Sequence, residues 1–336
     1  MTASERDDAA KGLLAASSRD RDFDASRKRQ LTADAALLLV TLIWGSTFVM
    51  VKDAVANFPV FSFLALRFAF AALVLLPFVV LRQRSARANV LESEATPPLR
   101  SSAPLLRVKR TAAPLLIGVA LLAGYSFQTA GLHLTTPAKA GFITGLSVVI
   151  VPLAAALLLR QPPGRNAWVG VGLALAGLAL LSLTAAMTIE PGDLLVLGCA
   201  VAFAAHILLT GYFSPRYDPL WLTLGQITTV AILSGVAALL VGSPSGPAAF
   251  TRGLTGQVLF AAAFTGILAT SFAFGVQTIA QRFTTSTHTA LIFAAEPVFA
   301  GLFSFLLIGE VLGPRQLVGC GLILAGMVVA EMRRDT

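Results

Sequence analysis

The chain has 336 residues, of which 56% are hydrophobic and only 12% are charged, and its formal net charge is +8. A soluble domain usually carries about 25% charged residues, so this composition excludes an ordinary soluble globular protein. In a membrane protein, an excess of Lys and Arg is typical of cytoplasmic loops. We therefore expect a lipid bilayer around the chain and no nucleic-acid partner.

The first 33 residues are polar and charged, and they contain no apolar segment of the kind found in a secretory signal peptide. Such a composition is typical of segments that cannot bury enough apolar surface to fold. The sequence predicts a disordered cytoplasmic tail over residues 1–33.

Apolar segments of about 18–23 residues follow the tail, and each is long enough to cross a hydrocarbon core of roughly 30 Å. Short runs containing Pro or Gly separate them. None shows the alternating pattern of barrel strands. The sequence predicts an all-α polytopic membrane protein with ten transmembrane helices, at 34–56, 60–81, 112–133, 138–159, 166–184, 193–213, 220–242, 256–281, 286–308 and 313–331.

Ten spans would place both termini on the same side of the membrane. The tail, the loops after the even-numbered spans and the C-terminal end together hold 20 of the 25 Lys and Arg residues. Because cytoplasmic loops carry this bias, we expect both termini to be cytoplasmic and the protein to lie in the cell inner membrane. The five exceptions are Lys52, Arg67, Lys139, Arg252 and Arg315.

The chain also resembles itself. Residues 128–177 align with 277–326 without a gap at an offset of 149, and Gln-Thr, Thr-Thr and a glycine pattern coincide. Upstream of this stretch the offset becomes 159, and the ten additional residues lie in the charged loop 82–111. We predict two five-helix repeats, 34–184 and 193–331. Five is an odd number, so the repeats would have inverted topology, which is a recurrent design of secondary transporters.

Four stretches resemble the EamA family of the drug/metabolite transporter superfamily. They are "LIWGSTFVMVKDAV" at 42–55, "FLALRFAFAALVLLPF" at 63–78, "TTPAKAGFITGLSVVIVPL" at 135–153 and "AAEPVFAGLFSFLLIGEVLGPRQLVGCGLILAGMVV" at 294–329. The resemblance covers nearly all of residues 34–331. It implies a ten-helix fold and secondary transport of small molecules, often export of amino acids or related metabolites.

Glu296 and Pro297 lie in the middle of the ninth predicted span. A carboxylate at the bilayer centre costs roughly 2.5–3.5 kcal/mol on insertion scales and usually faces the bundle interior. Proline removes a backbone hydrogen bond and kinks a helix. Glu296 is a candidate proton-coupling group or ligand for a cationic substrate group, or else a structural carboxylate bonded to a neighbouring helix. The resemblance includes this Glu-Pro pair as a common family feature.

Three of these five exceptions are candidate site residues. Lys52 and Lys139 are near the outer membrane face, where their side chains can extend to the interface. Arg67 lies deeper, and its guanidinium stays charged. It is a candidate ligand for a substrate carboxylate or phosphate. Pairing with Glu296 or with helix-end carbonyls is the alternative.

Other polar and aromatic residues lie within the spans. His206 is either a proton relay or a helix-packing residue. A pocket for a small amphipathic solute needs a mixture of aromatic and hydrogen-bonding groups, but buried amides also serve helix–helix contacts. The remaining candidates are Trp44, Thr47, Tyr125, Gln128 and Gln277.

Glycines in the fourth, fifth and tenth spans are expected to permit close helix packing. The similarity of the fifth and tenth helices suggests a homodimer face as a hypothesis. These glycines are Gly141, Gly145, Gly170, Gly177, Gly319 and Gly326.

The sequence lacks HExxH, Walker and CxxC motifs, so we expect no metal, no cofactor and no enzymatic activity. The preferred interpretation is a secondary-active transporter that exports a small amino-acid-like or amphipathic solute, with proton coupling as one energy source. An importer or exchanger of anionic or phosphorylated metabolites is the alternative within transport. A non-transporting membrane module or membrane enzyme is the alternative from another class.

Overall fold

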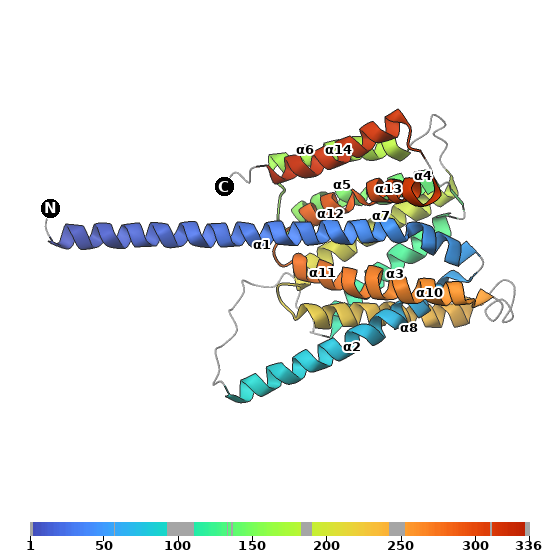
Figure 1. Ribbon diagram of the computed structural model, residues 1–336, viewed down its shortest axis with the longest axis horizontal. Coiled ribbons are helices and arrows are strands. Elements are labelled where there is room, and N and C mark those ends of the chain that lie inside the picture. Colours follow the sequence, from blue (N-terminus) through green and yellow to red (C-terminus); the bar gives the residue numbers. More distant parts are fainter. Residues whose placement is uncertain are drawn as a thin grey trace.

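The computed structural model describes residues 3–56, 58–92, 111–132, 134–135, 137–182, 190–241, 253–309 and 311–332. Helices run side by side through these residues and form one bundle (Figure 1). The described residues contain no β-strand. The prediction of an all-α polytopic membrane fold is therefore confirmed.

The helices follow one another with short connections. They are α1 (Ala3–Ala56), α2 (Val60–Glu92), α3 (Ala112–Leu132), α4 (Pro137–Gly145), α5 (Ser147–Leu158), α6 (Arg165–Ser182), α7 (Pro191–Phe213), α8 (Pro219–Val241), α10 (Gly256–Gly266), the π-helix η1 (Ile267–Phe272), α11 (Ala273–Ala280), α12 (Ser286–Phe293), α13 (Glu296–Ile308) and α14 (Pro314–Glu331).

Among the described residues, nine helical segments are long and apolar enough to cross a membrane. The segment at Arg165–Leu181 is apolar but shorter. It coincides with the span predicted at 166–184. The count of ten transmembrane helices therefore stays a prediction.

The N-terminal segment differs from the expectation. Residues 3–33, for which the sequence predicts a disordered tail, belong to the same helix as the first span, since α1 begins at Ala3. No proline interrupts residues 3–56, so nothing in the backbone forces a helix end between them. In Figure 1 this helix extends well beyond the bundle. Of the charged loop predicted at 82–111, residues 82–92 are helical as part of α2, and residues 93–110 lie outside the described part.

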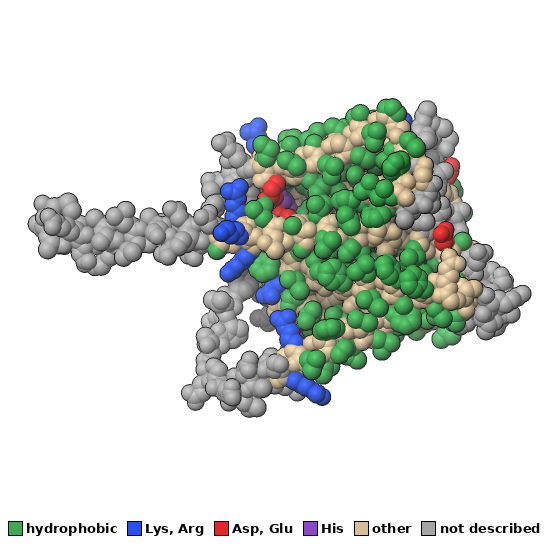
Figure 2. Space-filling view, in the orientation of Figure 1, with side chains coloured by type: hydrophobic (Ala, Val, Ile, Leu, Met, Phe, Trp, Pro, Cys, Tyr) green, Lys and Arg blue, Asp and Glu red, His purple; other side chains and the backbone are tan. Residues whose placement is uncertain are grey.

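Both chain ends lie toward the same end of the bundle, which we call the terminal end (Figure 1). Figure 2 shows that most of the visible Lys and Arg side chains gather there, while hydrophobic side chains cover the middle. Arg82 at this end pairs with Asp218 at 3.3 Å. The charge distribution in space thus follows the bias found along the sequence.

Two spans are broken in the middle. The sequence predicts one kinked helix over 286–308. The structure has two helices there, because Ala294 and Ala295 form a turn between α12 and α13. Pro297 occupies the first turn of α13, where a missing N–H costs nothing. A second break lies between α4 and α5 at Leu146. The starts of α5 and α13 are 149 residues apart, which is the offset of the sequence repeat.

Helices α6 and α14 pack closely through their glycines. A Cβ atom at Gly170 would lie 2.5 Å from the Gly326 carbonyl oxygen, and one at Gly177 would lie 2.5 Å from that of Gly319. All four glycines are buried in this contact within one chain. The glycine faces of these helices are thus already occupied, and they offer no argument for a homodimer.

The two glycines predicted for packing in the fourth span, Gly141 and Gly145, have different surroundings. A Cβ atom at Gly145 would lie 2.7 Å from the Leu178 side chain, so this glycine lets α4 approach α6. A Cβ atom at Gly141 would meet no atom within 4 Å. Of the two, only Gly145 makes a close contact in this structure.

Gly177→Val is expected to lower the thermal stability of the purified protein in detergent. The added side chain would enter the backbone of α14, and overpacking of this kind costs about 1–3 kcal/mol or more. Gly172→Val is the matched control, because Gly172 is exposed on the same helix with nothing within 4 Å of an added Cβ. Equal unfolding temperatures for the two variants would contradict this assignment.

Candidate functional site

Arg67 is buried in the bundle interior, with 5% of its surface exposed. It lies on α2 and faces η1 of the neighbouring span. Its Nε donates a hydrogen bond of 2.7 Å to Thr270 Oγ1, and one terminal nitrogen lies 3.4 Å from the Ala269 carbonyl oxygen. A guanidinium has five N–H donors in a fixed plane, so these two contacts orient it and leave other donors for a ligand.

The π-helix supplies the acceptors that hold Arg67. A π-turn is wider than an α-turn, and such segments are rare and frequently lie at functional sites. Here the N–H of Ala273 donates to the carbonyls of Leu268 and Thr270. The carbonyl of Ala269 accepts from outside the helix, from Trp44 Nε1 at 2.8 Å as well as from Arg67.

Aromatic rings surround this guanidinium. Its central carbon lies 5.5 Å from the centroid of the Tyr125 ring and 5.8 Å from that of Phe68. Tyr125 meets Phe203 edge-on at 5.6 Å, and Trp44 packs against Phe293 at 4.9 Å. Cation–π contacts stabilise a desolvated cation by up to about 2 kcal/mol. Trp44, Tyr125, Phe203 and Phe293 are all only half-buried, although they point into the bundle.

Glu296 is the acidic partner of this region. It begins α13, where the positive end of the helix dipole favours a carboxylate. Trp44 connects this helix start to Arg67, because the Trp44 ring packs against Phe293 of the preceding helix α12 and its Nε1 shares the Ala269 carbonyl with Arg67. Within the part of the chain that is described, Arg67 forms no ion pair. Two opposite charges therefore share one interior region lined by aromatic side chains, without neutralising each other by direct contact.

His206 belongs to a separate polar chain. Its Nε2 lies 2.8 Å from Gln226 Oε1, and Gln226 Nε2 donates to Thr278 Oγ1 at 3.4 Å. Because the amide nitrogen of Gln226 faces Thr278, its oxygen accepts from His206, which fixes the proton on Nε2. All three side chains are buried. The contacts join α7, α8 and α11, and the His206 ring also meets Phe274 at 5.5 Å.

Among the side chains that the structure describes, Thr47, Gln277 and Gln128 form no hydrogen bond with Arg67. Thr47 is buried and donates to the Trp44 carbonyl of its own helix. Gln277 donates to Gln281, which in turn donates to the Ile207 carbonyl. Gln128 is half-buried on α3. The side chains of Lys52 and Lys139 lie outside the described residues.

Sequence reasoning missed Thr270, Ala269 and the π-helix that contains them. The stretch "ILATSF" itself has neither Pro nor Gly, but Gly266 directly precedes it. A Cβ atom at Gly266 would lie 2.5 Å from the Arg67 carbonyl oxygen, so this glycine lets α2 approach the start of η1. Gly266 and the buried Thr-Ser pair at 270–271 are the local signals.

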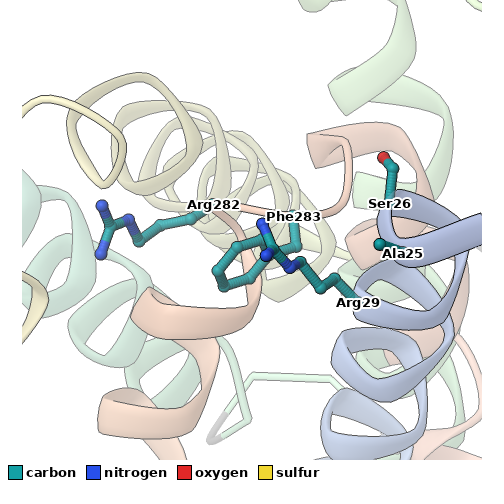
Figure 3. A pocket seen from close by; sticks show the side chains of 5 residues that line it. All are labelled: Ala25, Ser26, Arg29, Arg282 and Phe283. Atoms are coloured by element: carbon teal, nitrogen blue, oxygen red, sulfur yellow. The ribbon is translucent and has the colours of Figure 1, made fainter. Parts of the chain in front are cut away.

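A pocket of about 380 Å³ lies elsewhere, at the terminal end (Figure 3). It is formed by α1 and the turn after α11, and it contains none of the predicted site residues. Its lining is Ala25, Ser26, Arg29, Arg282 and Phe283.

Thr270→Val is expected to weaken substrate binding about tenfold, because a hydrogen bond to a charged group contributes about 1.5–3 kcal/mol. The change keeps the shape of the side chain and removes the acceptor for Arg67 Nε. Thr265→Val is the matched control, since buried Thr265 donates only to the Ala261 carbonyl of its own helix. Half-saturating substrate concentrations in reconstituted liposomes would check this. Equal values for the two variants would contradict the role of Thr270.

The model of the EamA-like transporter family matches two successive segments of the chain, residues 31–183 and 190–332. An uncharacterized transporter of Archaeoglobus fulgidus is 33% identical over 305 residues, covering 91% of this chain and 87% of that protein. The uncharacterized inner membrane transporter YedA of Escherichia coli is 25% identical over 302 residues, covering 88% and 90%. The structure superposes on one solved crystal structure with a TM-score of 0.70 and 21% sequence identity. The superposition covers 90% of this chain and 98% of that chain, and it supports the fold alone.

Proposed function

The chain belongs to the EamA-like transporter family and is a membrane transporter, and we propose that it is a secondary-active carrier. We propose that it exports a small amino-acid-like metabolite by alternating access. The observation that carries the substrate class is that Arg67 and the Glu296 end of α13 border one aromatic-lined region without forming an ion pair. Arg67 would bind the substrate carboxylate, since its planar fork suits that geometry.

Glu296 would take the substrate ammonium group. Ionisable side chains that face the interior of a membrane bundle usually belong to substrate or ion pathways. Trp44, Tyr125, Phe203 and Phe293 would contact the apolar part of the solute, as in pockets that combine aromatic walls with a few polar groups. This arrangement suits a zwitterion with a small apolar side chain.

Alternating access is supported by the two related halves. The family model matches the chain twice in succession, and the helix breaks before Ser147 and Glu296 recur at the repeat offset. In transporters with inverted repeats, each half can adopt the conformation of the other, which opens the site to one side and then to the opposite side. The site residues Arg67 and Glu296 come from different halves.

Proton coupling through Glu296 is part of the proposal. A protonated Glu296 would no longer attract an ammonium group, so proton entry would favour substrate release. Export, rather than import, rests on the family resemblance. The basic side chains at the terminal end support cytoplasmic termini in an inner membrane.

Solute counterflow tests the proposal. The purified chain would be reconstituted into liposomes loaded with unlabelled amino acids, phosphorylated metabolites, sugars or aromatic cations, and uptake of labelled solute would be followed with and without a pH gradient. We expect exchange of an amino-acid-like solute. Exchange of phosphorylated metabolites alone would favour the alternative function, a carrier of anionic metabolites. In such a carrier Arg67 would bind the phosphate group. The absence of any flux through folded protein would contradict a carrier.

A further inference from the structure

Asp34, His288 and Glu331 come together at the terminal end and are not among the residues that contact Arg67. One ligand-type atom from each lies within 4.8 Å of those from the other two. They belong to α1, α12 and α14, so residues from both halves of the chain meet here. We propose that these three side chains bind a divalent first-row transition metal ion of the Zn²⁺ type, which ties the start of the first half to the second half.

Asp34 gives the independent argument for a bound cation. Both of its carboxylate oxygens are buried, and neither accepts a hydrogen bond from any described residue. A buried carboxylate without partners is strongly unfavourable. Ala33, Leu37, Ala280 and Ile292 pack into an apolar layer next to it, and none of these four side chains can donate a hydrogen bond to a carboxylate. A cation held between Asp34, His288 and Glu331 would compensate this charge.

The distances suit such an ion. His288 Nδ1 lies 3.2 Å from Glu331 Oε2. Tetrahedral zinc binds nitrogen and oxygen ligands at about 2.0–2.2 Å, which separates neighbouring ligand atoms by about 3.3–3.6 Å. An imidazole with two carboxylates suits zinc and its neighbours better than Mg²⁺ or Ca²⁺, which prefer all-oxygen ligands.

Surrounding groups hold the candidate ligands in place. Gln30 Nε2 donates to the other carboxylate oxygen of Glu331 at 3.4 Å, as outer ligands do at metal sites. Thr285 caps α12 by accepting from the backbone N–H of His288 at 3.2 Å. These contacts fix the positions of Glu331 and His288 before an ion arrives.

Metal binding by the purified full chain tests this site. After chelation to remove bound metal, incubation with Zn²⁺ and dialysis to remove excess ion, we expect close to one Zn²⁺ per chain by elemental analysis. We also expect a higher unfolding temperature with Zn²⁺ than with Mg²⁺ or Ca²⁺. Asp34→Asn and Glu331→Gln should each lower Zn²⁺ affinity at least tenfold. Asp53→Asn is the matched control, because Asp53 is exposed near the other end of α1, and it should keep the wild-type affinity.

The wild-type measurement alone can overturn the proposal, even if a variant fails to fold. A chain that binds no Zn²⁺, or whose unfolding temperature is unchanged by Zn²⁺, would contradict it. The rival is a cluster that holds no ion and only packs α1 against α12 and α14. In that case Asp34→Asn would fold with wild-type or higher stability, and the wild type would bind no metal. Equal loss of Zn²⁺ binding in Asp53→Asn would also contradict the site.

Discussion

Arg67→Lys is expected to lower substrate exchange by on the order of 100-fold while the protein stays folded. The change keeps the positive charge but removes the planar fork that binds carboxylates with two parallel hydrogen bonds. It also removes the Nε donor that bonds to Thr270. Hydrogen bonds to charged groups contribute about 1.5–3 kcal/mol each, and about 1.4 kcal/mol corresponds to a factor of ten in affinity. Initial rates of counterflow would measure the loss.

The matched control is Arg315→Lys. Arg315 is exposed at the first turn of α14, at the opposite end of the bundle from the chain termini. We expect this variant to transport at the wild-type rate, with the same elution profile and unfolding temperature as Arg67→Lys. Wild-type transport by the Arg67→Lys variant would show that Arg67 holds helices together and does not contact the substrate.

Glu296→Gln is expected to abolish accumulation driven by a pH gradient while substrate exchange continues at reduced affinity. The amide has nearly the shape of the carboxylic acid but cannot bind or release a proton in the cycle. It also lacks the charge that attracts an ammonium group, and so the half-saturating concentration should rise about tenfold. Uptake with an imposed pH gradient, compared with uptake in exchange at equal pH, separates the two effects.

Asp53→Asn serves as the control for this variant as well, because it removes an exposed carboxylate outside the interior region. Its pH-driven accumulation should match the wild type. If Glu296→Gln kept the same pH dependence, Glu296 would not couple protons. His206 would then be the next group to test, although its contact with Gln226 favours a structural role.

Hydrophobic patterning was sufficient to predict the membrane-spanning helices, because long apolar runs have few stable alternatives in a bilayer. The ends were less predictable: α1 and α2 extend well beyond their predicted spans into charged sequence. A charged segment can stay helical when no proline interrupts it, and neither hydropathy nor the length of a span detects this.

The candidate site was predictable only in part. Arg67, Glu296, Trp44 and Tyr125 stood out because ionisable, amide or aromatic groups in the middle of an apolar span are unusual. Their mutual arrangement depends on η1, and its sequence "ILATSF" together with the preceding Gly266 does not distinguish a π-helix from an ordinary α-helix. The break before Glu296 has Pro297 as a signal, whereas the break at Leu146 has no proline at the corresponding position.

The cluster at the terminal end could not be found from sequence spacing. Asp34, His288 and Glu331 are separated by long stretches of chain: Asp34 lies within α1, whereas His288 and Glu331 lie near helix ends. Short-range metal-ligand motifs detect residues of one helix or loop. Only the packing of α1, α12 and α14 brings these three side chains together.

The central claim is that Arg67 and Glu296 bind the two ends of one zwitterionic solute. Once counterflow has identified a transported amino acid, its exchange should be competed with the same compound as the methyl ester and as the N-acetyl derivative. We expect the unmodified zwitterion to compete at least tenfold better than either derivative. Equal competition by the N-acetyl derivative would mean that Glu296 does not bind the ammonium group, and it would contradict the claim.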